Sequence, residues 1–227
     1  MIRVTAFRWV PPFAQGLVRD LRARWALEEA GLPYEVRLIG FDDQKTAAYR
    51  ALQPFGQVPA LEDGELTLFE SGAIVLHVAE RSSALMPADP KERELVRTWT
   101  FAALNSVEPP ISMLNFIDLQ PGGVREGAKP LRETVAGWIG TRLDDLARFL
   151  GDREHLVAGR FTAADLMMTT VLRNLRNTDL VAQRPTLDAY KQRGEARPAF
   201  QKALAAQMAA FAANAPAPNP PQPQPKP

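Results

Sequence analysis

The chain has 227 residues, of which 46% are hydrophobic and 23% are charged, and its formal net charge is +1 at pH 7. These values are typical of a folded globular protein with one large or two small domains. The near-zero charge gives no reason to expect nucleic acid or an anionic membrane as a partner. With no cysteine and two histidines, we expect no disulfide, no protein thiol acting as nucleophile and no bound metal.

The chain also shows no sign of membrane insertion or secretion. No stretch approaches the roughly 18–20 apolar residues that a membrane span needs. The N-terminal MIRVTAFRWVPPF is interrupted by Arg3 and Arg8 and is not followed by a small-residue cleavage site. We therefore expect a cytoplasmic protein.

The first part of the chain predicts an α/β domain over residues 1–81. Short apolar runs bounded by turn residues predict strands, at 2–7, 34–39, 58–61 and 66–69. Helical spacing of apolar residues predicts helices, from Leu17 to a glycine and proline near residue 31, at 45–52, and from Ser71 onward. The order is strand, helix, strand, helix, two strands and a helix.

A loop-like linker, 82–90, separates this domain from an all-helical one over residues 91–213. Its first helix follows Asp89-Pro90, a good start signal, and Pro109-Pro110 should end or kink it. Further helices are predicted at 131–150, 163–175 and 198–213, and Thr162 with Asp165 predicts a capping box. The proline-rich segment 214–227 is expected to be a disordered tail.

One proline interrupts this pattern. The run FGQVPAL places Pro59 inside an apparent strand, although proline cannot donate to a β-ladder and is normally confined to edges, first positions and bulges. An ordinary edge-strand proline is one explanation. The longer segment GQVPALEDGELTLFESGAI, together with WALEEAGLPYE and AGRFTAADLMM, resembles the glutathione S-transferase superfamily.

This resemblance implies a thioredoxin-like N-terminal domain followed by an all-helical C-terminal domain. It also implies a cis bond between Val58 and Pro59, which are assigned to the glutathione site. In the superfamily the residue before this proline pairs through its backbone with the cysteinyl part of glutathione, which serves as a co-substrate. Pairing of this kind is strand addition.

The resemblance assigns further glutathione contacts. Glu70 and Ser71 stand where the family holds the γ-glutamyl group: a serine at a helix N-terminus can bind a carboxylate, and Glu70 can meet the α-ammonium. Ser71 could equally be a simple N-cap. Candidates for binding the glycyl carboxylate are Gln57, Gln44 and Lys45. Alternatively, they are ordinary surface residues without a role in binding.

The chain departs from the family in the loop after the first strand. Most members place Tyr, Ser or Cys there, whereas no Tyr, Ser, Thr or Cys lies between Thr5 and Arg24. Lowering a thiol pKa by ~2 units needs about 2.7 kcal/mol, more than the ~0.3–1 kcal/mol that a helix dipole typically supplies. Gln15 and Arg19 are therefore the catalytic candidates, beside backbone N–H groups, although Arg19 could instead form a surface ion pair with Asp20.

The predicted function is transfer of the glutathione thiolate to a small hydrophobic electrophile. The alternatives are reduction of a disulfide or peroxide by bound glutathione, and a non-catalytic glutathione-binding or regulatory protein on the same fold. The resemblance also implies a two-fold homodimer. The electrophile pocket is expected between the domains, with walls from Trp9, Pro12, Phe13, Trp99, Asn105 and Met113.

Overall fold

The computed structural model describes residues 1–120 and 122–217, so residues 218–227 of the predicted tail lie outside the described residues. The N-terminal domain has a four-stranded sheet in the order β2-β1-β3-β4. Strand β1 is parallel to β2 and antiparallel to β3, and β4 is antiparallel to β3. The strands are β1 (Ile2–Phe7), β2 (Tyr34–Ile39), β3 (Ala60–Asp63) and β4 (Leu66–Phe69).

Helix α1 (Asp20–Ala30) connects β1 to β2, and α2 (Ala47–Leu52) and α3 (Ser71–Ala79) complete the domain. Gly31 ends α1 with a φ of 64°, a left-handed conformation that glycine adopts at little cost. Single turns of 3₁₀-helix lie at Pro12–Ala14 and Asp43–Lys45. This order and sheet topology are those of the expected thioredoxin-like domain.

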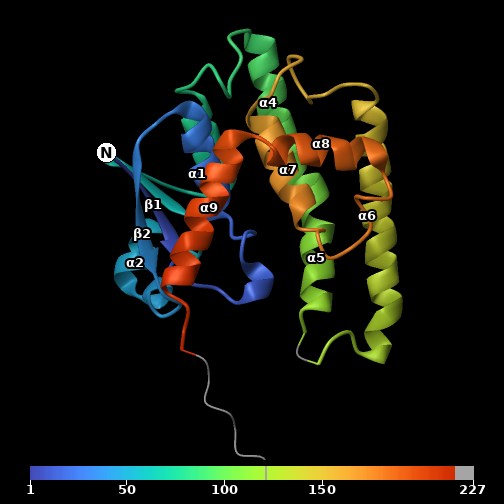
Figure 1. Ribbon diagram of the computed structural model, residues 1–227, viewed down its shortest axis with the longest axis horizontal. Helices are drawn as coiled ribbons and strands as arrows, with labels where there is room; N and C mark the ends of the chain where they lie inside the picture. Colours follow the sequence, from blue (N-terminus) through green and yellow to red (C-terminus); the bar gives the residue numbers. More distant parts are fainter. Residues whose placement is uncertain (121, 218–227) are drawn as a thin grey trace, which may run out of the picture.

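The second domain is all-helical, as expected. It contains α4 (Pro90–Ala102), a π-helical turn (Ala103–Val107), α5 (Glu108–Asp118), a 3₁₀ turn (Glu126–Ala128), α6 (Lys129–Leu150), α7 (Ala163–Arg173), α8 (Pro185–Glu195) and α9 (Pro198–Ala213). Figure 1 shows α9 returning to the first domain, where it packs along α1. No helix in the described part of the chain combines the length and the apolar character that a bilayer crossing needs.

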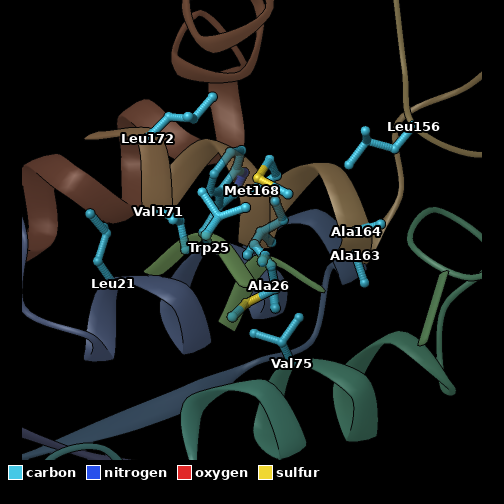
Figure 2. Packing of buried hydrophobic residues seen from close by; sticks show 14 of the residues in the cluster. Leu21, Trp25, Ala26, Val75, Leu156, Ala163, Ala164, Met168, Val171 and Leu172 are labelled. Atoms are coloured by element: carbon cyan, nitrogen blue, oxygen red, sulfur yellow. The ribbon is translucent and has the colours of Figure 1, made fainter. Parts of the chain in front are cut away.

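One large hydrophobic cluster spans the two domains. Trp25 on α1 is fully buried, with ring centroids 5.5 Å from Phe161 and 4.8 Å from Phe200. Figure 2 shows Trp25 of α1 beside Val171 and Met168 of α7. Because α1 and α7 share this cluster, the start of α1 is held against the helical domain.

The predicted capping box starts α7. The Asp165 carboxylate accepts hydrogen bonds from the backbone N–H groups of Thr162 and Leu156, both at 2.9 Å, and from the Tyr190 hydroxyl at 2.9 Å. Burial raises the pKa of Asp165 despite these bonds. The carboxylate thus satisfies buried donors and fixes the helix that carries the core.

Candidate active site

The backbone at Val58 is free to bind a ligand. The Val58–Pro59 peptide bond is cis, and β3 begins only after it, at Ala60. Within residues 1–120 and 122–217, neither the N–H nor the C=O of Val58 makes a hydrogen bond. The Val58 side chain is buried beside Tyr49, whose hydroxyl donates to the Gln57 carbonyl at 2.6 Å. An extended peptide along this edge could therefore exchange backbone hydrogen bonds with Val58.

A second loop lies against this segment. Gly56 has a φ of +64°, and a Cβ there would lie 2.8 Å from the carbonyl oxygen of Gln44. Both the backbone conformation and the close approach therefore require glycine. The structure thus brings Gln44 next to the segment that carries Gln57. The neighbouring Lys45 ammonium pairs with Asp42 at 2.9 Å in an exposed ion pair.

Helix α3 presents a free N-terminus. Glu70, just before it, has a φ of 67°. This conformation is uncommon for a non-glycine residue, and residues that adopt it are concentrated at active sites and ligand sites. The first N–H groups of any helix have no intrahelical partners, and no side chain among the described residues caps this end. Arg22 on α1 donates to the Ser71 Oγ at 3.1 Å, which leaves the Ser71 hydroxyl proton to donate to an anion. This helix end can hold a carboxylate.

A buried ion pair connects α1 with α5. The Arg22 side chain is 3% exposed and donates to the two carboxylate oxygens of Glu108 at 2.9 and 3.2 Å. Arg19, 46% exposed, donates to the same carboxylate at 3.0 Å. Burial raises the pKa of Glu108, but the charges and hydrogen bonds of Arg22 and Arg19 outweigh it and hold that pKa below its usual value. Arg19 therefore pairs across the domains, while Asp20 pairs with Arg24 at 2.7 Å.

The π-helical turn positions Glu108. Proline lacks an N–H donor, and its ring crowds the carbonyl four residues earlier. At Pro109-Pro110 the helix continues all the same, passing from α4 through the wider turn Ala103–Val107 into α5. Such turns are rare and often occur at functional sites. Here the turn ends directly before Glu108, whose carboxylate meets α1.

These groups surround a cavity of about 510 Å³ between the domains. At one end, Ser71 and the α3 N-terminus suit a carboxylate. Glu70 also lines the cavity and makes no ion pair within the described residues, so it can accept an ammonium group. The site therefore suits a zwitterionic α-amino acid group. Asn105 joins this lining, together with the apolar side chains of Leu76, Phe101 and Leu104.

A second cavity, of about 190 Å³, lies between the β1–α1 loop (residues 8–19) and the helical domain. Its loop side is apolar, with Phe13 and Leu17. Its helical side carries carboxamides, from Asn115, Asn174 and Asn177. One wall also contains Asp118, whose carboxylate is bound by Arg132 at 2.6 and 2.9 Å. This cavity can take a small molecule with an apolar face and a polar edge.

The expected electrophile-pocket residues are dispersed. Phe13 lines the smaller cavity, whereas Asn105 lines the larger one. Trp99 packs on Phe149 with ring centroids 4.4 Å apart, and Met113 is exposed at the surface. The remaining two, Trp9 and Pro12, line neither cavity.

The two catalytic candidates are both engaged in the structure. The Gln15 amide donates to the Val10 carbonyl at 3.0 Å and so braces its own loop. Arg19 lines the larger cavity while it pairs with Glu108. Among the residues described, no group of three or more His, Asp or Glu side chains is placed to hold a metal ion.

Sequence reasoning missed Arg22, which contacts both Ser71 and Glu108. Arg22 is one of three buried charged residues of α1, with Asp20 and Arg24, and its partner Glu108 lies 86 positions away in the chain. The three asparagines of the smaller cavity carried no signal, because isolated amides on helices are ordinary surface residues.

Family models match both parts of the chain. The model for the glutathione S-transferase N-terminal domain matches residues 14–80, and that for the glutathione S-transferase C-terminal domain matches residues 126–207. The chain is 32% identical over 196 residues to a glutathione S-transferase of Hyoscyamus muticus, which covers 81% of this chain and 92% of that protein.

Solved structures with the same fold include plant and bacterial proteins. Glutathione transferase F7 from Populus trichocarpa has a TM-score of 0.78 and 25% identity, covering 92% of this chain and 99% of that one. A glutathione transferase from Burkholderia graminis, with two glutathione molecules bound per protein subunit, has a TM-score of 0.77 and 27% identity. The match covers 89% of this chain and 87% of that one.

Proposed function

The chain belongs to the glutathione S-transferase family and is an enzyme of this type, and we propose that it transfers the thiolate of glutathione to a small hydrophobic electrophile. One observation supports this most strongly. The free backbone edge at Val58 precedes β3, and the open helix end at Ser71 follows β4, in the same domain. Together they suit the cysteinyl and γ-glutamyl parts of glutathione.

In this proposal the γ-glutamyl carboxylate lies at the start of α3, where it accepts from the Ser71 hydroxyl and the first N–H groups. The α-ammonium meets Glu70. The cysteinyl backbone pairs with Val58, beyond which the glycyl carboxylate lies near Gln44 and Gln57. Arg22 and Glu108 take no direct part, but their ion pair fixes the Ser71 hydroxyl.

The electrophile occupies the cavity between the β1–α1 loop and the helical domain. Phe13 and Leu17 cover its apolar face. The glutathione sulfur forms a bond to the electrophilic carbon while the leaving group departs with its electron pair. No protein nucleophile is needed, which agrees with a chain that has no cysteine.

Conjugation of glutathione to a chlorodinitrobenzene tests the proposal directly. The protein should accelerate formation of the thioether over the solution reaction, and Ser71→Ala should lose affinity for glutathione. The exposed Ser112→Ala provides a matched control, which should behave like the unmodified protein. Binding of glutathione without any thioether formation, across a panel of aromatic and alkyl electrophiles, would refute conjugation.

A second candidate function is reduction of a disulfide by a pair of glutathiones. The three carboxamides of the smaller cavity favour it, because they could hold a second peptide; the Burkholderia graminis relative has two glutathione molecules bound. One thiolate attacks the disulfide and releases a thiol, and the second glutathione then displaces the other thiol to give glutathione disulfide. Glutathione disulfide would accumulate in this case, whereas conjugation yields none.

A homodimer is also part of the proposal. Leu66 and Phe69 on β4, with Leu95 and Phe101 on α4, are all exposed apolar side chains. Contact between β4 of one copy and α4 of another would cover both pairs. Light scattering should give twice the 25.1 kDa mass of one chain, and Phe69→Glu should give the single-chain mass. A monomer for the unmodified protein would refute this assembly.

A further inference from the structure

Side chains from the C-terminal part of the chain hold the β1–α1 loop by its carbonyl groups. Arg176 donates to the carbonyl oxygens of Phe13 and Gln15, both at 2.8 Å. Arg173 donates to the carbonyl oxygen of Gly16 at 3.1 Å. The donors and acceptors are between 157 and 163 positions apart in the chain.

A third side chain completes this set. Gln207 on α9 is buried and donates to the Val18 carbonyl at 3.3 Å and to the Asp20 carboxylate at 2.8 Å. Arg173 is itself fixed, because it pairs with Glu195 and stacks over the Phe200 ring. The loop is thus bound by groups that are held in place by the helical domain.

Fixing a carbonyl also fixes the next N–H, since the two point in opposite directions across a trans peptide bond. Both peptide bonds concerned, Gln15–Gly16 and Val18–Arg19, are trans. The Gln15 carbonyl faces Arg176, and the Val18 carbonyl accepts both from Gln207 and from the Leu21 N–H of α1, at 3.0 Å, so the N–H groups of Gly16 and Arg19 point away from these donors. Neither N–H makes a hydrogen bond in residues 1–120 and 122–217, nor does that of Val18, whereas the Leu17 N–H donates to Ala14.

Oriented N–H groups of this kind can stabilise an anion without rearranging during the reaction. The loop offers no hydroxyl or thiol for that purpose. We propose that Arg176 and Gln207 are positioning residues that direct the N–H groups of Gly16 and Arg19 toward the glutathione sulfur, where they replace the missing hydroxyl, while Arg173 holds the Gly16 carbonyl between them. This inference rests on the proposed function.

Arg176 is the residue to change, because it is exposed and makes no ion pair in the part of the chain that the structure describes. Arg176→Ala should raise the pKa of the bound glutathione thiol by about one unit, measured from ultraviolet thiolate absorbance against pH. The rate constant kcat at neutral pH should fall about tenfold and recover above the new pKa. Arg176→Lys keeps the charge but loses the paired N–H donors of the guanidinium group, and should show the same rise in thiol pKa.

Two controls separate positioning from other effects. Arg160→Ala removes an arginine that donates to a loop carbonyl elsewhere, that of Ala84, at 3.3 Å, and should leave the thiol pKa unchanged. Affinity for S-methylglutathione, which has no ionisable thiol, should be the same in Arg176→Ala as in the unmodified protein. A loss of this affinity would mean that Arg176 shapes the whole site and would overturn the inference.

The remaining outcomes are also decisive. An unchanged thiol pKa in Arg176→Ala, or a normal pKa in Arg176→Lys, would overturn the inference while leaving the proposed function intact. Failure of the unmodified protein to bind glutathione would instead remove the proposed function, and the inference with it.

Discussion

The two ends of the active-site cleft are built in different ways. The end assigned to the γ-glutamyl and cysteinyl groups comes from one stretch of chain, from Gly56 through Val58 to Ser71. The end assigned to the sulfur is the β1–α1 loop, whose carbonyls are bound by Arg173 and Arg176 from the far side of the sequence. In this assignment the residues proposed to bind the ligand come mostly from one stretch of chain, whereas the orientation of the loop depends on how the helical domain packs.

The largest expected effect comes from removing Glu108, whose ion pair with Arg22 joins α5 to α1. Glu108→Ala leaves Arg22 buried without a counter-charge, which typically costs about 3–5 kcal/mol in free energy of unfolding. Urea denaturation should show this loss. The exposed pair of Asp145 and Arg148 provides the control, since Asp145→Ala should cost at most about 1 kcal/mol. A cost below about 1 kcal/mol for Glu108→Ala would mean that the two domains do not depend on this pair.

The locally encoded end can be disturbed alone by Gly56→Ala. The substitution adds a left-handed strain of about 1–2 kcal/mol to a clash with the Gln44 carbonyl, so a total loss of about 2–4 kcal/mol in the free energy of unfolding is expected. Gly64→Ala is the matched control, because Gly64 has a φ of +63° but no atom of the described residues within 4 Å of an added Cβ. Equal losses for the two variants would show that the Gln44 contact has no energetic effect.

A smaller change tests ligand binding at the same end. Ser71→Ala should weaken glutathione binding by about 1–3 kcal/mol, the usual effect of losing a hydrogen bond to a charged group. The pKa of the thiol that remains bound should not change, because the sulfur lies at the other end of the cleft. Calorimetry measures the first quantity and thiolate absorbance the second. A shift in thiol pKa would show that the two ends are not separable.

The smallest expected effect is a pH dependence of stability. The folded-state pKa of Glu108 is lowered by Arg22 and Arg19, against the effect of burial, so its ionisation stabilises the fold above the unfolded pKa of about 4.3. That stability is lost as the pH falls through the folded pKa. The difference in free energy of unfolding between the unmodified protein and Glu108→Gln should therefore narrow between about pH 5 and pH 3. A constant difference would contradict the assigned direction.

Much of the fold could be predicted because its signals are local. The bounds of β1, β2, β4 and α9 agree with the alternation, turn and proline signals that predicted them. Predicted starts differ where the chain turns: α1 begins at Asp20 rather than Leu17, and β3 begins at Ala60, after the cis bond. Helix α8 was not predicted, since its polar sequence shows only a weak apolar stripe.

In the candidate site, too, only the residues with local sequence signals could be predicted. Glu70 and Ser71 line one cavity, and their assignment to the γ-glutamyl group, made from a local motif, stays a prediction. By contrast, Gln15 donates to its own loop, and the groups that bind the loop, Arg173 and Arg176, are ordinary charged residues in the sequence. Local patterns contain no information about which distant carbonyl an arginine will reach.

A crystal structure of the protein with glutathione tests the central claim most directly. The account predicts the γ-glutamyl carboxylate within hydrogen-bond distance of Ser71, and the sulfur within about 3.5 Å of the N–H of Gly16 or Arg19. The carbonyls of Gln15 and Val18 should still accept from Arg176 and Gln207. A sulfur more than about 4 Å from both N–H groups, beyond hydrogen-bond reach, would contradict the account.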